Sequence, residues 1–195
     1  ELYLARAMRL SLPAIVSPFS THRRRASRRA WPFGVLVAGA IAGLAVLPLQ
    51  AASADKEFRK GLSAYHGGRF DEAMRVWLPL AGREDAPAQA GIGFMYYRGL
   101  GVAVDYPKAA FWLRKAAQHG QPEGQMMLGT LYFYGRGVEQ SYVWSYAWCD
   151  LAQNGGNADA SMCRDASLQS LANDNDLKKA FRLSVDLHQR FHRKK

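Results

Sequence analysis

Two stretches of the chain, GIGFMYYRGLGV (91–102) and LGTLYFYGRGV (128–138), repeat one pattern of small, aromatic and glycine residues. When the sequence is compared with itself, the match extends at a fixed offset of 36 residues. The residues that recur are Gly93, Tyr96, Gly99, Gly101, Val102, Trp112, Ala116 and Gly120, which return as Gly129, Tyr132, Gly135, Gly137, Val138, Trp148, Ala152 and Gly156. A period between about 20 and 50 residues is typical of proteins that stack small units in a row.

Each repeated unit predicts two helices joined by a turn. In the first unit, the apolar residues 88–98 predict a helix, and the glycines of 99–105 predict a turn because glycine tolerates a positive φ. Residues 107–118 predict the second helix, with Asp105 as its N-cap, and Ser141 is expected to cap the corresponding helix of the second unit. We therefore predict an all-α fold, an α/α superhelical solenoid of helical hairpins.

The two quoted stretches, each followed by a helix that closes with Ala-x-x-x-Gly, resemble the Sel1-like repeat family, which is related to tetratricopeptide repeats. The resemblance covers residues 88–158. Upstream, residues 58–86 are similar to a shorter tetratricopeptide-like hairpin. That pattern's positions are occupied by Gly61, Tyr65, Gly68, Ala73 and Trp77. The resemblance implies an adaptor or scaffold role, frequently in bacterial envelope or signalling assemblies, and it leaves the protein partner unidentified.

These observations divide the chain into five parts. The predicted parts are a signal peptide or N-terminal membrane anchor (1–54), a degenerate tetratricopeptide-like hairpin (55–87), two Sel1-like repeats (88–123 and 124–158) and a C-terminal helical cap with a basic tail (159–195). A cap is expected because the last repeat of a solenoid would otherwise expose its apolar face.

The first 54 residues have the features of an export signal. A basic run (22–29) precedes an uncharged stretch (31–54) that ends in the small residues Ala52, Ser53 and Ala54. This order favours a signal peptide cleaved before residue 55. The alternative is an uncleaved anchor, because the uncharged run reaches the roughly 20 residues that a spanning helix needs. Both alternatives predict export, either into the periplasm or onto the inner membrane facing it. Residues 27–31 also resemble a twin-arginine signal, so the export route stays open.

The formal net charge of +10 does not indicate nucleic-acid binding. Seven of the 26 basic residues and one of the 16 acidic residues lie in residues 1–54, which leaves 19 basic and 15 acidic residues in the rest. A surface of mixed signs is a poor counterion-release surface for a polyphosphate.

Positions that differ between the two units are the ones that stacking does not dictate. These positions carry Phe94, Tyr97 and Arg98 in the first unit and Thr130, Phe133 and Tyr134 in the second. Spacings of three and four residues place each set on one helical face. We interpret them as the lining of a groove for a protein or peptide partner, because aromatic residues and arginine are typical anchors. Two alternatives stay open: these side chains pack against the adjoining helix, or Tyr97 and Phe133 are stacking platforms for a cell-wall glycan.

The two cysteines, Cys149 and Cys163, stand seven residues before and seven residues after Gly156. A hairpin that turns at 155–157 would bring them to the same height, and an oxidising compartment would allow a disulfide. Related proteins with cysteine-bridged helical pairs are consistent with this pairing. The alternative is two reduced thiols in the core.

We predict no enzymatic activity, no cofactor and no small-molecule substrate. The sequence shows no nucleophile paired with a base and no phosphate-binding glycine loop. His188 and His192 have a spacing that could share a metal ion, but Asp186 is the one further ligand nearby, so no metal site is predicted. The alternative is an envelope enzyme of modest activity, which would need an acid, a base or a nucleophile in the groove.

Overall fold

The computed structural model of the chain describes residues 46–192, and these residues form helices without any strand. The helices are α2 (Val46–His66), α3 (Phe70–Gly82), α4 (Ala86–Arg98), α5 (Tyr106–Gln118), α6 (Pro122–Tyr134), α7 (Tyr142–Asn154), α8 (Ala160–Gln169) and α9 (Asp174–His192). The predicted leader lies outside the described residues as far as residue 45. In the described part of the chain, no helix is both long and apolar enough to cross a membrane.

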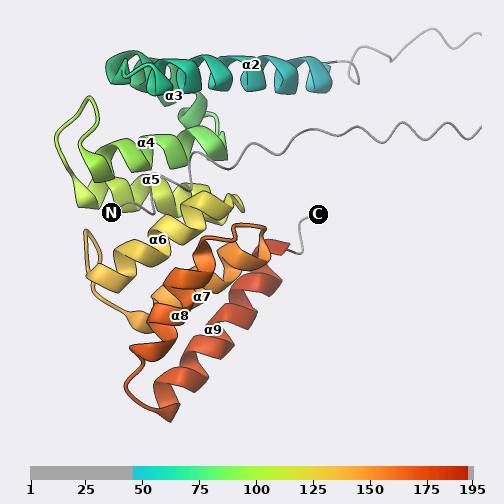
Figure 1. The fold of residues 1–195 in the computed structure, drawn as a ribbon. Helices are drawn as coiled ribbons and strands as arrows, with labels where there is room; N and C mark the ends of the chain where they lie inside the picture. The colour runs from blue at the N-terminus through green and yellow to red at the C-terminus, as the bar shows by residue number, and fades with distance from the viewer. Residues whose placement is uncertain (1–45, 193–195) are drawn as a thin grey trace, which may run out of the picture.

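Helices α2 and α3, α4 and α5, and α6 and α7 pair into three antiparallel hairpins that stack in chain order, and α8 and α9 both pack against α7 at the end of the stack (Figure 1). The second helix of the first three hairpins begins at Phe70, Tyr106 and Tyr142, so the 36-residue period extends back into the first hairpin. The predicted all-α solenoid is confirmed.

Turn glycines and capping side chains set the helix ends. Gly99 and Gly135 end α4 and α6 in the left-handed conformation, with φ of 70° and 65°, which glycine adopts without a steric penalty. Asp105 and Ser141 accept hydrogen bonds from backbone amides of α5 and α7 at 2.8 and 3.3 Å, as predicted.

The hairpins are joined by contacts that recur at the same offset. Gln89 and Gln125 are buried, and their side-chain amides donate to backbone carbonyls of the preceding hairpin, Ala81 at 3.0 Å and Ala117 at 3.1 Å. This paired hydrogen bond fixes each first helix against the hairpin before it.

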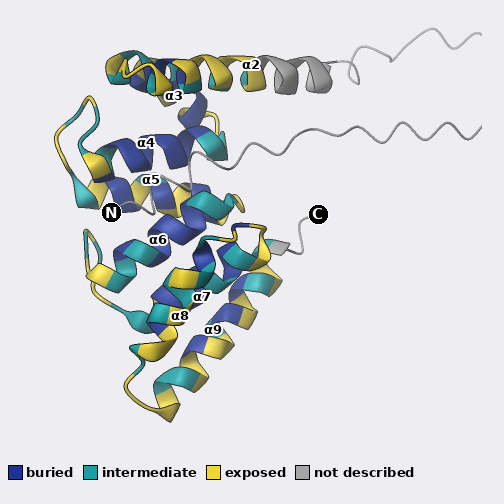
Figure 2. Cartoon of the chain, viewed as in Figure 1, coloured by how far each residue is buried: buried dark blue, intermediate teal, exposed yellow. Residues whose placement is uncertain are grey.

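The core runs along the centre of the stack (Figure 2). Helices α4 and α6 are buried around most of their circumference, whereas α9 exposes one face to solvent. Small residues permit this close packing: a Cβ at Gly91 would come within 2.7 Å of the Trp77 ring. The Trp77 indole donates a hydrogen bond to the Phe58 carbonyl at 3.2 Å, which closes the first hairpin.

At the other end of the stack, α9 covers α7. Leu187 of α9 is buried in the core, and the rings of Phe191 and Trp148 lie 5.8 Å apart. The Ser184 hydroxyl donates to the Asp150 carboxylate at 2.5 Å. Helix α9 therefore shields the apolar side of α7, as expected of a cap.

Candidate functional site

A pocket of about 520 Å³ opens between α4, α6 and α8. The residues that line it are Tyr97, Arg98, Met126, Thr130, Phe133, Tyr134, Arg136, Asp159, Met162, Cys163 and Ala166. Helix α4 contributes its last turn, α6 most of its length and α8 the opposite wall. The pocket thus spans the two hairpins that contain α4 and α6, and it is closed on one side by α8.

Five of the six predicted groove residues line this pocket: Tyr97, Arg98, Thr130, Phe133 and Tyr134. The sixth, Phe94, is 3% exposed and lies in the core, with its ring 6.2 Å from that of Tyr65. The physical reason is that the first hairpin covers this side of α4. For Phe94, the structure therefore shows the alternative of packing against a neighbouring helix.

The pocket combines a buried apolar floor with exposed apolar groups at its rim. Met126 is buried, whereas Tyr134 is 57% exposed and Met162 is 49% exposed. The Thr130 hydroxyl donates to the Met126 carbonyl at 3.0 Å within α6, so its proton is already used. An apolar side chain that entered here would remove both exposed groups from water.

Arg136 is a pocket residue that the sequence analysis did not identify. Its Nη1 donates to the Tyr97 hydroxyl at 2.9 Å, and its guanidinium carbon lies 5.8, 5.3 and 5.1 Å from the ring centroids of Tyr97, Tyr106 and Tyr134. Burial raises the pKa of Tyr97, and the charge of Arg136 opposes that rise. The sequence could have identified Arg136 as a position that differs between the two units, because the equivalent residue in the first unit is Leu100.

The wall formed by α8 is covalently fixed to α7. Cys149 and Cys163 form a disulfide with Cα atoms 5.9 Å apart, and Cys163 lines the pocket. Close to it, Ser145 of α7 and Ser167 of α8 share a hydrogen bond of 2.6 Å. The disulfide is therefore part of the pocket's framework.

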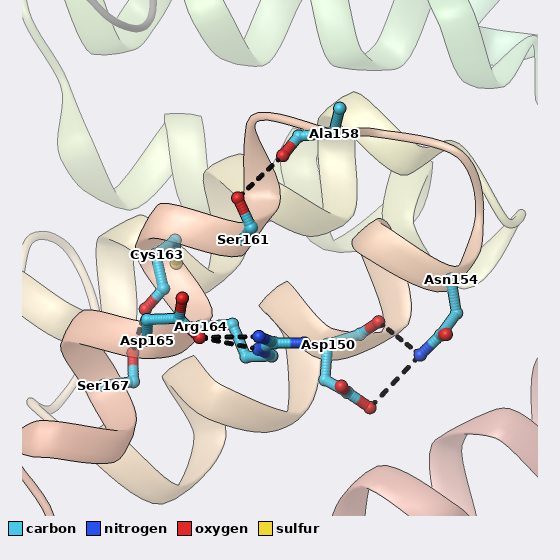
Figure 3. Close-up of polar contacts among 8 residues, drawn as sticks. All are labelled: Asp150, Asn154, Ala158, Ser161, Cys163, Arg164, Asp165 and Ser167. Carbon is cyan, nitrogen blue, oxygen red and sulfur yellow. Dashed lines mark hydrogen bonds and ion pairs between the residues drawn. The ribbon is translucent and has the colours of Figure 1, made fainter.

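A second polar cluster lies between α7 and α8, away from the pocket (Figure 3). Arg164 donates two hydrogen bonds to the Asp165 carboxylate, at 2.9 and 2.7 Å, and its side chain extends toward Asp150. The backbone carbonyl of Asp150 accepts a hydrogen bond from the Asn154 side chain at 2.9 Å. These contacts pair charges and cap helices. They leave no activated nucleophile.

Ser184, Asp150 and His188 lie near one another but lack the geometry of a catalytic triad. Ser184 is 5% exposed and donates directly to the Asp150 carboxylate. The His188 ring contacts the Ser184 backbone carbonyl at 2.9 Å instead of its hydroxyl. A triad needs the histidine between the hydroxyl and the carboxylate. Among the described residues, no group of three or more His, Cys, Asp or Glu side chains could hold a metal ion.

The stacked hairpins and the lined groove define a repeat protein of the α/α solenoid class. Comparison with known protein families matches the Sel1 repeat to residues 86–121 and 122–157, ranges that begin with α4 and α6. The family match therefore covers two consecutive units of the chain, and it confirms the resemblance to Sel1 repeats seen in the sequence. Sel1 repeats generally mediate protein–protein interactions.

Solved structures show the same architecture. The chain is similar to a protective antigen of uropathogenic Escherichia coli strains displaying an SLR fold, with a TM-score of 0.67 and 28% identity over 71% of this chain and 30% of the antigen. It is also similar to a Sel1 repeat protein from Oxalobacter formigenes, with a TM-score of 0.54 and 25% identity over 66% of this chain and 54% of that protein. Less than two thirds of either relative is therefore spanned. Curated proteins gave no match.

Proposed function

We propose that the chain is a non-enzymatic scaffold that binds a segment of a partner protein in the pocket between α4, α6 and α8. The observation that carries this proposal is the gathering of Tyr97, Phe133 and Tyr134, with two arginines, around one open apolar pocket. Aromatic residues and arginine are the side chains that most often dominate binding energy at protein interfaces.

The pocket's dimensions suit a short peptide segment. A volume of about 520 Å³ accommodates a few side chains, and the walls belong to rigid helices fixed by a disulfide and by repeated glutamine hydrogen bonds. A preformed site binds with less loss of conformational entropy than one that must order on binding. In peptide recognition, a short extended or helical segment of one protein commonly docks into an apolar groove of the other.

We further propose that the chain acts in the bacterial cell envelope, either in the periplasm or held on the inner membrane by its leader. The basic run (22–29) and the uncharged stretch that follows it support this location. The disulfide between Cys149 and Cys163 adds support, because such bonds persist in oxidising compartments.

The glycan alternative loses support at its two named residues. A sugar-stacking platform needs an open ring face. Tyr97 is buried and its ring faces Arg136, whereas Phe133 is half-buried against Tyr142 with ring centroids 5.3 Å apart. Both rings therefore serve the pocket's walls better than a flat sugar face.

The test is capture of a partner from envelope extract by the full chain and two variants. Tyr134→Ala with Met162→Ala removes the two exposed apolar groups of the pocket, and Phe111→Ala removes a ring that is 52% exposed outside it. We expect one specific protein to be retained by the parent and by Phe111→Ala and to be lost by the pocket variant. Equal retention by all three would contradict the proposal.

The location is tested separately by fractionating cells that carry the full-length chain and sequencing the N-terminus of the recovered protein. An envelope fraction is expected, and a cytosolic pool with an intact leader would overturn the export proposal.

A further inference from the structure

Three charged side chains line the pocket: Arg98 from α4, Arg136 from the turn after α6, and Asp159 before α8. Among the described residues, none of the three forms an ion pair. The pocket therefore presents two unpaired positive charges and one unpaired negative charge around an apolar floor. A purely apolar segment would desolvate these groups without compensating them.

Arg136 is held in place before any ligand arrives. The rings of Tyr97, Tyr106 and Tyr134 surround its guanidinium at 5.1 to 5.8 Å, and one of its N–H groups is bonded to the Tyr97 hydroxyl. A guanidinium has five N–H donors, so most remain for a bound group. Because the side chain is already ordered, binding loses little of its rotamer entropy.

Stacking of the repeats does not require an arginine here. In the first unit the same turn position is Leu100, which packs against the core. In the second unit Arg136 takes this place, and Tyr134 packs beside it where the first unit has Arg98. The pair of departures puts a guanidinium and an exposed ring at the mouth of the pocket.

We infer that the pocket selects a peptide segment carrying one carboxylate beside a large apolar side chain. This inference rests on the proposed function. Arg136, assisted by Arg98, binds the carboxylate through charge-assisted hydrogen bonds. The apolar side chain enters between Met126 and Met162. Asp159 repels a second acid, so runs of acidic residues are disfavoured.

The test is selection of peptides by the immobilised full chain. A library of random dodecapeptides is displayed in two formats, one with its C-terminus fused and one with it free, which separates a side-chain carboxylate from a terminal one. Enriched sequences are synthesised with their glutamine or asparagine (for a free terminus, amide) counterparts. We expect enrichment of one carboxylate next to a large apolar residue.

Variants then locate the contact. Replacing the carboxylate by its amide is expected to weaken binding about tenfold on the parent but little on Arg136→Gln, since the pair interacts directly. Arg136→Lys should recover part of the loss. Arg114→Gln is the matched control, because Arg114 also contacts a tyrosine hydroxyl, that of Tyr132 at 3.4 Å, yet lies outside the pocket.

The other outcomes separate the two proposals. If the enriched peptides lack a carboxylate, yet bind the parent and not the Tyr134→Ala, Met162→Ala variant, this inference is overturned and the proposed function stands. The same conclusion follows if Arg136→Gln weakens carboxylate and amide peptides equally, because Arg136 would then act only on the fold. Absence of any enriched peptide that depends on the pocket would overturn both.

Discussion

Glu84 stands where the two repeats have a closing glycine. It has a φ of 66°, and the equivalent residues at the 36-residue offset, Gly120 and Gly156, have φ of 79° and 101°. This left-handed conformation is unfavourable for a residue with a Cβ. We expect Glu84→Gly to raise the free energy of unfolding by about 1 kcal/mol in urea denaturation. Gly120→Ala, where nothing lies within 4 Å of the new Cβ, should lower it by a similar amount. Changes of the same sign would contradict this account.

Gly137 combines a positive φ with close contact to the preceding repeat. Its φ is 70°, and a Cβ there would strike the Tyr106 carbonyl and the nitrogen of Pro107. Because backbone atoms cannot move aside easily, Gly137→Ala is expected to lower the free energy of unfolding by about 3 kcal/mol. Gly120→Ala supplies the control, as it carries only the backbone strain. Equal losses in the two variants would show that the inter-repeat contact is not tight.

Ionisation of Tyr97 makes the stability of the fold decrease with pH in the alkaline range. Burial raises its pKa in the folded chain above the value of about 10 expected when unfolded. Its contribution is therefore fully present below that unfolded pKa and is lost as pH rises through the folded-state pKa. We expect the melting temperature of Tyr97→Phe to fall less steeply than that of the parent above pH 10. Tyr65 and Tyr146, whose pKa values burial also raises, leave a shared residual slope. Parallel curves would exclude a role for Tyr97.

Individual side chains were predictable from the sequence only where they repeat. Asp105 and Ser141 follow turn glycines at equivalent positions, so their capping roles could be predicted. Phe94 could not be placed, because helical spacing defines a face without saying which neighbour covers it. Arg136 was missed since a single arginine between two turn glycines looks like an exposed turn residue. Its tyrosine contacts come from α4, α5 and α6, which local sequence does not relate.

At the scale of elements, α8 depends on its covalent link to α7. Its buried residues are Ala160 and Ser167, which provide little apolar area. The disulfide closes a loop with a sequence separation of 14, for which about 3 kcal/mol of stabilisation is typical. Reduction by dithiothreitol is therefore expected to lower the free energy of unfolding by about that amount and to speed amide exchange in α8.

The double variant Cys149→Ala, Cys163→Ala is the control for this reduction. It should resemble the reduced parent and be insensitive to dithiothreitol. If the parent kept both its midpoint of denaturation and the exchange protection of α8 after reduction, the helix would be held by its packing alone. Because Cys163 lines the pocket, the reduced chain should also bind selected peptides more weakly.

The elements inside the repeats could be predicted, and the third wall of the pocket could not. Glycines and capping residues mark the helix ends in both units at the same 36-residue offset, so the second unit supports the helix boundaries predicted for the first. Helix α8 lies beyond the matched repeats and begins 38 residues after α6. Nothing in its sequence indicates that Met162 and Ala166 face the second repeat. Such a placement follows from the stacking geometry.

At the scale of the whole molecule, the hairpins contact their neighbours along the stack (Figure 1). Their buried residues form two core clusters, and Tyr65, Tyr96 and Leu100 pack against both clusters. The first hairpin packs on α4 through Trp77, and α9 packs on α7 through Leu187 and Phe191. Stability in such stacks is close to a sum of unit and nearest-neighbour terms. A change at one end should therefore weaken the adjacent hairpin most and the distant one least.

Removal of α9 tests this graded dependence. A chain that ends at Ser170 loses the cover of α7, including the Ser184 hydrogen bond to Asp150. We expect a loss of several kcal/mol in the free energy of unfolding and self-association, because an uncapped repeat exposes its apolar face. Amide exchange should speed up in α7 and α6 while α2 and α3 keep their protection.

A chain that ends at His192 is the control for the loss of tail charge. If the truncated chain stayed monomeric with the parent's denaturation midpoint, α9 would contribute nothing to the stability of the stack. If all helices lost protection equally, the stack would unfold as one cooperative unit.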